Sequence, residues 1–479
     1  MNLDLQGVLK VSLNSHENLG LKEIPDYDTI TNLFMSLFKN FLNYVLPSVL
    51  SFVLAGIYCF VDAFFVGNKV GDSGIAAINI AYSLIAFMQA AGSGIGIGAS
   101  VRYSVATAQG KTEEASRYLN TSYILMTLAG IIISIPMLVF PIQLLELLGA
   151  SRSIAELGKP YFMILAAGSL VQVFGTGFTP IVRNCGKPFI AMISMIAGLV
   201  INIILDWYFV WIKNLGLTGA AAASVIAEAI AFVICLVCLI GVKKIHLKCR
   251  YFVSYAKHIL QIGLSPFGLT MIPNVSVIVM NRACLRYGGE QALGAYGCIS
   301  YLFCIIALVI QGIDDGAQPL ISTYYGRGDE KSLSYIKKLT MLFSMIFSLV
   351  SVAVCIPNGY RYGIFMGTSE SVASIIKNGI VIFSVGIPCL AVSRTITSNF
   401  YASGENLKSY VISYIEPVFI FIFLQILPHI SGQNGVWMAN SAGQMCVMIL
   451  AILLKRSPEN KKRVAAKQQL SLNDVTESE

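Results

Sequence analysis

Long apolar stretches alternate with short polar ones from about residue 40 to residue 455. Each stretch is about as long as the ~20 residues that a helix needs to cross a hydrocarbon core of roughly 30 Å. By this length criterion, the pattern predicts about twelve membrane-spanning helices, at 40–66, 75–107, 119–145, 158–182, 188–212, 217–242, 258–286, 292–325, 334–357, 372–400, 408–428 and 434–455. The predicted fold class is therefore an all-α integral membrane protein.

Composition supports a membrane protein. Of the 479 residues, 56% are hydrophobic and 12% are charged, whereas soluble domains have about 25% charged residues. The basic residues gather in 243–250 and 455–463. This segregation follows the positive-inside rule and predicts that both termini are cytoplasmic. It also argues against a nucleic-acid partner, although the net charge is +8.

The two halves of the chain resemble each other. The segment "NCGKP" around Gly186 is echoed by "ASGEN" around Gly404, and Gly216 by Gly435, at offsets of 218 and 219. Two six-helix bundles related by a pseudo-two-fold axis along the membrane normal are a plan used by secondary transporters. The predicted organisation is a cytoplasmic N-terminal segment, a first bundle, a basic cytoplasmic linker, a second bundle and a cytoplasmic tail, at 1–39, 40–245, 246–257, 258–455 and 456–479.

A carboxylate lies within the first apolar stretch. Asp62, in "YCFVDAFFVGN", follows more than twenty residues without another ionisable acid or base, and such a residue inside a membrane is by default functional. Asn202 and Asp206 are four residues apart and so share one helix face. Two nearby carboxylates in low dielectric do not both ionise cheaply, so the pair would take up H⁺ or hold Na⁺. The alternative for Asp62 is a buried acid hydrogen-bonded to a neighbouring helix.

A second polar segment is "LVIQGIDDGAQPLIS". Gln311, Asp315 and Gln318 are spaced to form one polar stripe on a helix, with Asp314 beside it. The stripe is a candidate lining for a substrate cavity, or alternatively a polar contact between helices. Glu228 is a further cavity candidate.

Three more features complete the set of candidates. Glu416 lies in an apolar stretch, and Arg394 would neutralise one acid; a structural ion pair is an equal alternative. Pro47 and Pro266, early in the opening spans of the two halves, are hinge candidates because proline bends helices. The segment "CLVC" at 235–238 has a spacing seen in redox and zinc sites, but it lacks a partner pair, so we expect its cysteines to pack in the core. No HExxH motif, carboxylate cluster or phosphate-binding loop is present in the sequence. We therefore expect no cofactor beyond a coupling ion, and no enzyme activity.

Five segments in order, "LPSVLSFVLAGIYCFVDAFFVG", "PIVRNCGKP", "NIILDWYFV", "GLTGAAAASVIAE" and "AQPLISTYYGRG", together resemble the multidrug and toxic compound extrusion (MATE) transporters. The resemblance implies a V-shaped pair of bundles that exports amphipathic, often cationic compounds in exchange for H⁺ or Na⁺. Asp62 matches the family's first-helix aspartate, and Asn202 and Asp206 match the N-x-x-x-D motif of the DinF-like branch. Ser224 stands where that branch usually has threonine.

The NorM-like branch has a glutamate in its seventh helix and an aspartate in its tenth. These positions are Asn274, a cavity candidate, and about Val392 here, so the chain resembles the DinF-like branch more closely. Two other classes of function stay open: a flippase for lipid-linked saccharides, which would need a basic cavity, and an intramembrane enzyme or channel. The expected partners are the lipid bilayer of the cell membrane and small amphipathic or cationic compounds, with the protein acting as a monomer.

Overall fold

The computed structural model describes residues 27–70, 72–148, 150–242 and 251–456, and this part is built of helices without strands. Within these helices it does not describe the side chains of residues 27–31, 33, 57–70, 72–77, 79, 82, 83, 241 and 242. The helices in chain order are α2 (Tyr27–Val70), α3 (Asp72–Ala108), α4 (Thr112–Val139), α5 (Pro141–Leu147), α6 (Arg152–Ala167), α7 (Ser169–Asn184), α8 (Pro188–Asp206), the π-helix η1 (Trp207–Ile212), α9 (Gly216–Val242), α10 (Phe252–Arg327), α11 (Glu330–Phe365), α12 (Glu370–Ser384), α13 (Gly386–Ala402), α14 (Asn406–Ser431) and α15 (Gln433–Arg456).

Nine helices of the described chain are long and apolar enough to cross a membrane, or eleven segments if each of two bent pairs is one span. The bent pairs are α6 with α7, at 55°, and α12 with α13, at 43°. The predicted spans 158–182 and 372–400 are therefore each broken. At the first break, a Cβ on Gly168 would lie only 2.5 Å from the Val225 side chain, so glycine permits the close approach of α9. Helix α2 also begins at Tyr27 rather than near residue 40.

Helix α10 contains two of the predicted spans. It has 76 residues, which at 1.5 Å per residue is roughly 114 Å, far more than one bilayer. The predicted boundary between 286 and 292 lies at Gly289, whose φ of 66° and ψ of −162° are not helical. Only glycine adopts this conformation readily, so Gly289 marks where the chain can turn between two spans.

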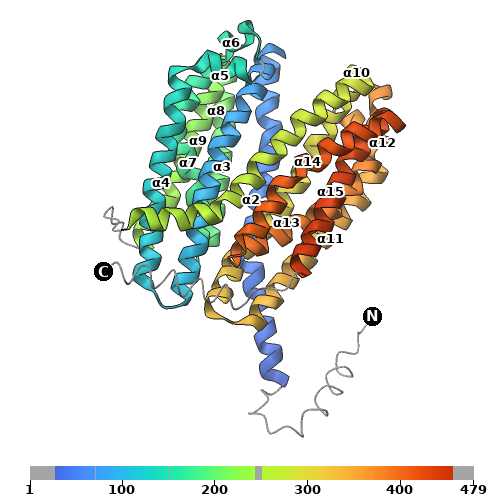
Figure 1. Cartoon of the computed structure of the whole chain (residues 1–479). Helices are drawn as coiled ribbons and strands as arrows, with labels where there is room; N and C mark the ends of the chain where they lie inside the picture. The colour runs from blue at the N-terminus through green and yellow to red at the C-terminus, as the bar shows by residue number, and fades with distance from the viewer. Residues whose placement is uncertain (1–26, 71, 149, 243–250, 457–479) are drawn as a thin grey trace.

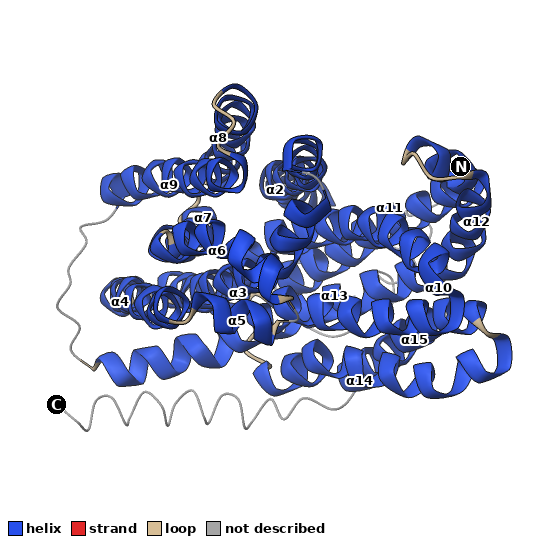
Figure 2. Ribbon diagram, turned by 90° about the horizontal axis from the view of Figure 1, so that it is seen from above, coloured by secondary structure: helices blue, strands red, loops and turns tan. Residues whose placement is uncertain are grey.

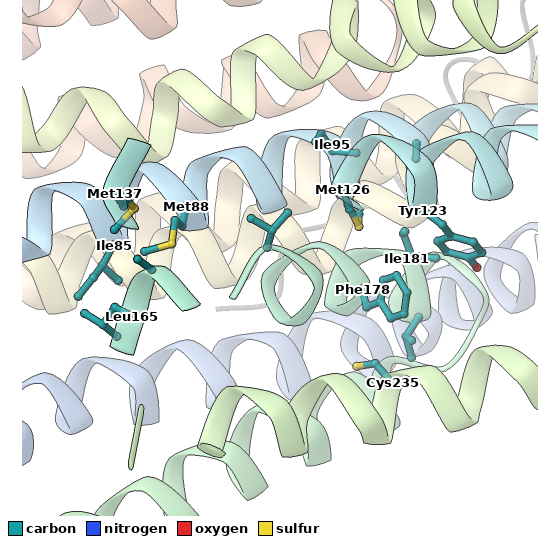
Figure 3. Close-up of a cluster of buried hydrophobic side chains, with 14 of the residues drawn as sticks. Ile85, Met88, Ile95, Tyr123, Met126, Met137, Leu165, Phe178, Ile181 and Cys235 are labelled. Atoms are coloured by element: carbon teal, nitrogen blue, oxygen red, sulfur yellow. The ribbon is translucent and has the colours of Figure 1, made fainter. Parts of the chain in front are cut away.

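The helices form two groups that lie close together at one end of the molecule and diverge toward the other (Figure 1). Helices α3 to α9 make up one group, seen from above in Figure 2. Helices α11 to α15 make up the other, together with the part of α10 that follows Gly289. Each group has its own apolar core; Figure 3 shows part of the first core, including Met88, Met126 and Phe178. A third core joins the groups and includes Phe41 of α2, Ile97 of α3 and Ile321 of α10. We call the end that carries loops 109–111 and 328–329 the closed end.

The glycine-rich segment "AGSGIGIGAS" of α3 explains how one helix packs against both groups. A Cβ on Gly96 would collide with the backbone of Gly177 in α7, and one on Gly98 with the carbonyl oxygen of Ile259 in α10. Alternate glycines thus face opposite neighbours, since residues two apart on a helix point roughly 200° apart. Removing the side chains lets three helices meet at backbone distance.

Helix α2 is longer than one bilayer requires, and it begins at the closed end. Its 44 residues span roughly 66 Å. Near its start, the Phe34 ring lies 4.7 Å from that of Tyr335 in α11, and the Phe41 ring lies 5.2 Å from that of Phe343. The first helix therefore packs against a helix of the second group.

Candidate functional site

A buried ion pair joins the two groups of helices. Arg183, near the end of α7, donates through Nη1 to the backbone oxygen of Asp315 at 2.9 Å and lies 3.7 Å from the Asp315 carboxylate Oδ2. The two side chains are 4% and 10% exposed. A buried pair of this kind has already lost the hydration of both charges, so removing one partner is far costlier than at a surface.

An amide pair lies beside it. Asn184 Nδ2 donates to Gln318 Oε1 at 2.8 Å, and Gln318 Nε2 donates back to Asn184 Oδ1 at 3.3 Å. Ser104 Oγ of α3 also donates a hydrogen bond to Asn184 Oδ1, at 2.7 Å. We call these five residues, Ser104, Arg183, Asn184, Asp315 and Gln318, the junction network. It gives the closed end a set of directional contacts between α3 and α7 on one side and α10 on the other.

Two glycines place this segment of α10 against α2. A Cβ on Gly316 would lie 2.6 Å from Cα of Val45, and one on Gly312 would lie 2.9 Å from Cα of Val49. Because both glycines face α2, the adjacent acids, Asp314 and Asp315, are held on the other faces of α10.

Asp314 is buried within the second group. Thr395 Oγ1 of α13 donates to Asp314 Oδ1 at 2.9 Å and lies 3.1 Å from Ser344 Oγ of α11. Glu416 of α14 is half-buried, and Ser276 Oγ donates to its Oε1 at 3.5 Å.

Two cavities adjoin these acids and share Arg394 and Leu269. The junction cavity is lined by Ser93, Ile97, Pro266, Leu269, Gln311, Asp314, Asp315, Arg394, Ser398 and Tyr401. The bundle cavity is lined by Leu269, Ile272, Pro273, Ser393, Arg394, Thr397, Ile412, Ser413, Glu416 and Val447. Of the predicted polar stripe, Gln311 and Asp315 thus face the junction cavity, together with Asp314, while Gln318 lies in the junction network.

Replacing Thr395 with valine should lower thermal stability. The change keeps the shape of the side chain but removes the hydrogen bond to buried Asp314, which leaves an acceptor unsatisfied at a cost of about 1–3 kcal/mol. Thr397→Val is the matched control, because Thr397 is buried on the same helix and bonds only within it, to Ser393 O. Equal shifts in melting temperature for the two purified variants would show that the contact to Asp314 contributes nothing.

The predicted coupling residues lie in the first group. Asp206 is fully buried at the end of α8, where the chain continues as the π-helix η1. Asn202, one turn earlier, donates through Nδ2 to Ser224 Oγ of α9 at 3.5 Å. Helix α8 packs directly against α2, which carries Asp62. The structure thus brings Asn202 and Ser224 together and places Asp206 one helical turn from Asn202. The side chain of Asp62 lies outside the described residues, so a coupling site formed by all four stays a prediction.

The remaining candidates pack against neighbouring helices or bond within their own. The Glu228 carboxylate lies against Gly175 of α7, where any Cβ would collide with it. Asn274 Nδ2 donates to Thr270 O of its own helix at 3.2 Å. Pro47 and Pro266 are both buried inside their helices, and Pro266 lines the junction cavity.

Sequence reasoning missed Arg183 and Asn184. Both stand in the quoted segment "PIVRNCGKP", and the available signal was a charged residue at the end of an apolar stretch. Within the described residues, no three His, Cys, Asp or Glu side chains are grouped so as to hold a metal ion.

Apolar helices in two diverging groups, with buried ionisable residues where the groups meet, are features of polytopic membrane transporters. The MatE family model matches the chain twice, at residues 47–208 and 266–427. The chain therefore belongs to the MatE family, a family of multidrug and toxic compound extrusion transporters and not of enzymes. The two matches begin 219 residues apart (266 − 47), in line with the offsets of 218 and 219 in the sequence.

Relatives and solved structures agree with this assignment. The chain is 23% identical over 423 residues to the multidrug export protein MepA of Staphylococcus aureus, covering 87% of this chain and 93% of that protein. It is 23% identical over 437 residues to MepA of Staphylococcus saprophyticus, covering 88% and 94%. A crystal structure of MATE in complex with MaL6 superimposes with a TM-score of 0.81 at 21% identity, over 90% of this chain and 97% of that one. A structure of an outward-facing multidrug resistance MATE transporter of the MOP superfamily superimposes with a TM-score of 0.80 at 21% sequence identity. The match covers 90% of this chain and 96% of that one.

Proposed function

We propose that this protein is a cation-coupled multidrug efflux antiporter that exports amphipathic, cationic compounds by alternating access. The observation that carries the proposal is the double match to the MatE family, one in each half of the chain. The relatives named multidrug export proteins support it, since they cover nearly the whole chain. The coupling ion, H⁺ or Na⁺, would bind at Asp62 and Asp206, with Asn202 and Ser224 completing the site.

The architecture that we propose has twelve membrane-spanning helices. Eleven segments pass the length and composition test when each bent pair is one span, and α10 supplies one more if Gly289 divides it in two. These form two six-helix bundles with pseudo-two-fold symmetry along the membrane normal, closer to the DinF-like branch. Both termini would face the cytoplasm of a cell-membrane protein that works as a monomer. The closed end would be cytoplasmic, because the chain enters α10 there from the basic stretch 243–250, so the structure would be open outward.

Alternating access would require the closed end to part. The junction network and the third core would separate, while the groups approach each other at the opposite end. A bound cation and a bound substrate drive exchange only if their affinities differ between the two states. A coupling site within the first bundle, at the contact of α8 with α2, would bias how α2 packs against α10.

The test is ethidium transport in liposomes that contain the purified protein, under an imposed pH gradient and separately under a Na⁺ gradient. We expect transport to follow one gradient, and Asp206→Asn and Asp62→Asn each to abolish this coupling. Glu156→Gln is the control, because this acid is exposed on α6. Variants that transport like the wild type would place the coupling site elsewhere. A wild type that ignores the dye under both gradients would contradict multidrug export and favour lipid-linked saccharides as the next substrate to test.

A further inference from the structure

The cavities at the second bundle contain an unbalanced set of charges. Three acids, Asp314, Asp315 and Glu416, lie among two cations, Arg183 and Arg394. Arg183 is committed to Asp315 through the buried ion pair. Fully ionised, the set would carry three negative and two positive charges, a net of −1. An excess charge in a low-dielectric interior is expensive unless a cation neutralises it.

Of the residues that the structure describes, Arg394 is the only basic one that lines either cavity, and both cavities include it. It is 9% exposed, and its Nε has no hydrogen-bond partner within the described part of the chain. Among the described residues it makes no ion pair within 4.0 Å with Asp314 or Glu416. One acid stands on each side of it, since Asp314 lines the junction cavity and Glu416 lines the bundle cavity. A single guanidinium can neutralise only one of these two carboxylates.

We propose that Asp314 and Glu416 share one proton and that Arg394 pairs with whichever of the two is ionised. With the proton on Glu416, Arg394 neutralises Asp314; with the proton on Asp314, it neutralises Glu416. The proton leaves as H⁺ to water in the adjoining cavity, and no bond other than the O–H bond is made or broken. The inference rests on the proposed function, to which it adds a proton site in the second bundle, separate from Asp62 and Asp206.

The surroundings favour a proton over a metal ion. The described residues contain no group of three acids, histidines or cysteines that would hold a metal, and the nearby guanidinium repels any cation in the same cavity. The other groups that face the two acids are neutral or already committed. Thr395 of α13 donates to Asp314, Ser276 of α10 donates to Glu416, Tyr401 of α13 accepts a hydrogen bond from Ser398, and Arg183 of α7 holds Asp315.

The experiment is infrared difference spectroscopy of the purified protein between acidic and alkaline buffer. The C=O stretch of a protonated carboxylic acid reports the proton directly, and carbon-13-labelled glutamate or aspartate identifies its carrier. In the wild type we expect a carboxylic acid band of which one part shifts with labelled glutamate and another with labelled aspartate. Glu416→Gln and Asp314→Asn should each lower the carboxylic acid band by the intensity of one protonated group, because Arg394 then keeps the remaining acid ionised. Arg394→Gln should enlarge the band by one further proton.

Two results would overturn the inference: a band that keeps its full intensity in both acid variants, or one that does not grow in Arg394→Gln. Glu156→Gln is the control, since Glu156 is a glutamate exposed on α6 that lines neither cavity. The labelled wild type gives an answer even if one variant fails to fold, because a band untouched by labelled glutamate excludes Glu416 as a carrier. The infrared spectrum can be recorded without transport, so it can be interpreted even if the proposed export is wrong. Equally, the absence of the expected band would leave the proposal of dye export coupled at Asp206 standing.

Discussion

Arg183→Gln is expected to destabilise the protein by about 3–5 kcal/mol, the cost of leaving a buried charge without its partner. The Asp315 carboxylate would keep its position inside the junction network but lose the guanidinium that lies 3.7 Å away. The loss should appear as a large fall in the melting temperature of the purified protein. Dye transport should fall with it, because the closed end would be held by fewer contacts between the two groups of helices.

The matched test is the double variant Arg183→Gln with Asp315→Asn. It removes both charges at once, so most of the stability should return, whereas each single variant should be severely affected. Arg152→Gln is the surface control: Arg152 contacts Glu146 and Glu156 with all three side chains largely exposed, and such pairs contribute little. If Arg183→Gln were as mild as Arg152→Gln, the buried pair would have no role in stability.

Gly98→Leu is expected to prevent the closed end from forming. A Cβ at residue 98 would collide with the carbonyl oxygen of Ile259, and backbone cannot move aside as a flexible side chain can. Overpacking of a tight contact costs about 1–3 kcal/mol, and more where neither helix can shift. We expect the variant to lose transport and to leave a cysteine pair placed across α3 and α10 too far apart to cross-link.

Gly294→Ala provides the control for the same kind of change. Nothing lies within 4 Å of a Cβ built on Gly294, so the helix should tolerate alanine and gain up to about 1 kcal/mol from its higher helix propensity. Normal cross-linking in Gly98→Leu would show that α3 and α10 need no glycine contact.

The fold was largely predictable because its dominant signal is hydrophobic length. The predicted boundaries of α3 and α9 agree with the structure within a few residues, since a single apolar helix of fixed length leaves little freedom. The breaks near Gly168 and Val385 were not predictable. Apolar residues continue through both breaks, and the reason to bend lies in the packing of neighbouring helices. The start of α2 at Tyr27 was missed for a similar reason: the aromatic contacts that order it come from α11.

The site was predictable only within single helices. Helical spacing placed Gln311, Asp315 and Gln318 on related faces and paired Asn202 with Asp206, because i and i+4 residues are neighbours on any helix. Helical spacing does not indicate which other helix these residues face in the folded protein. The partners Arg183 and Asn184 lie more than 130 residues away in the chain, and only the tertiary arrangement brings them together. Arg183 thus neutralises the charge of Asp315. When all are ionised, Asp314, Glu416 and Arg394 together leave one excess negative charge beside the two cavities.

The length of α2 makes it a lever. From Tyr27 to Pro47 is 20 residues, or roughly 30 Å of helix, and this arm carries Phe34 against Tyr335 of the opposite group. Phe34 lies 13 residues (47 − 34) from Pro47, or roughly 20 Å along the helix, so a rotation of about ten degrees near Pro47 would move it by roughly 3.5 Å. The centres of the two rings lie 4.7 Å apart. A small reorientation within the bilayer is thereby magnified at Phe34, where the aromatic contact would break or re-form as the transporter changes state.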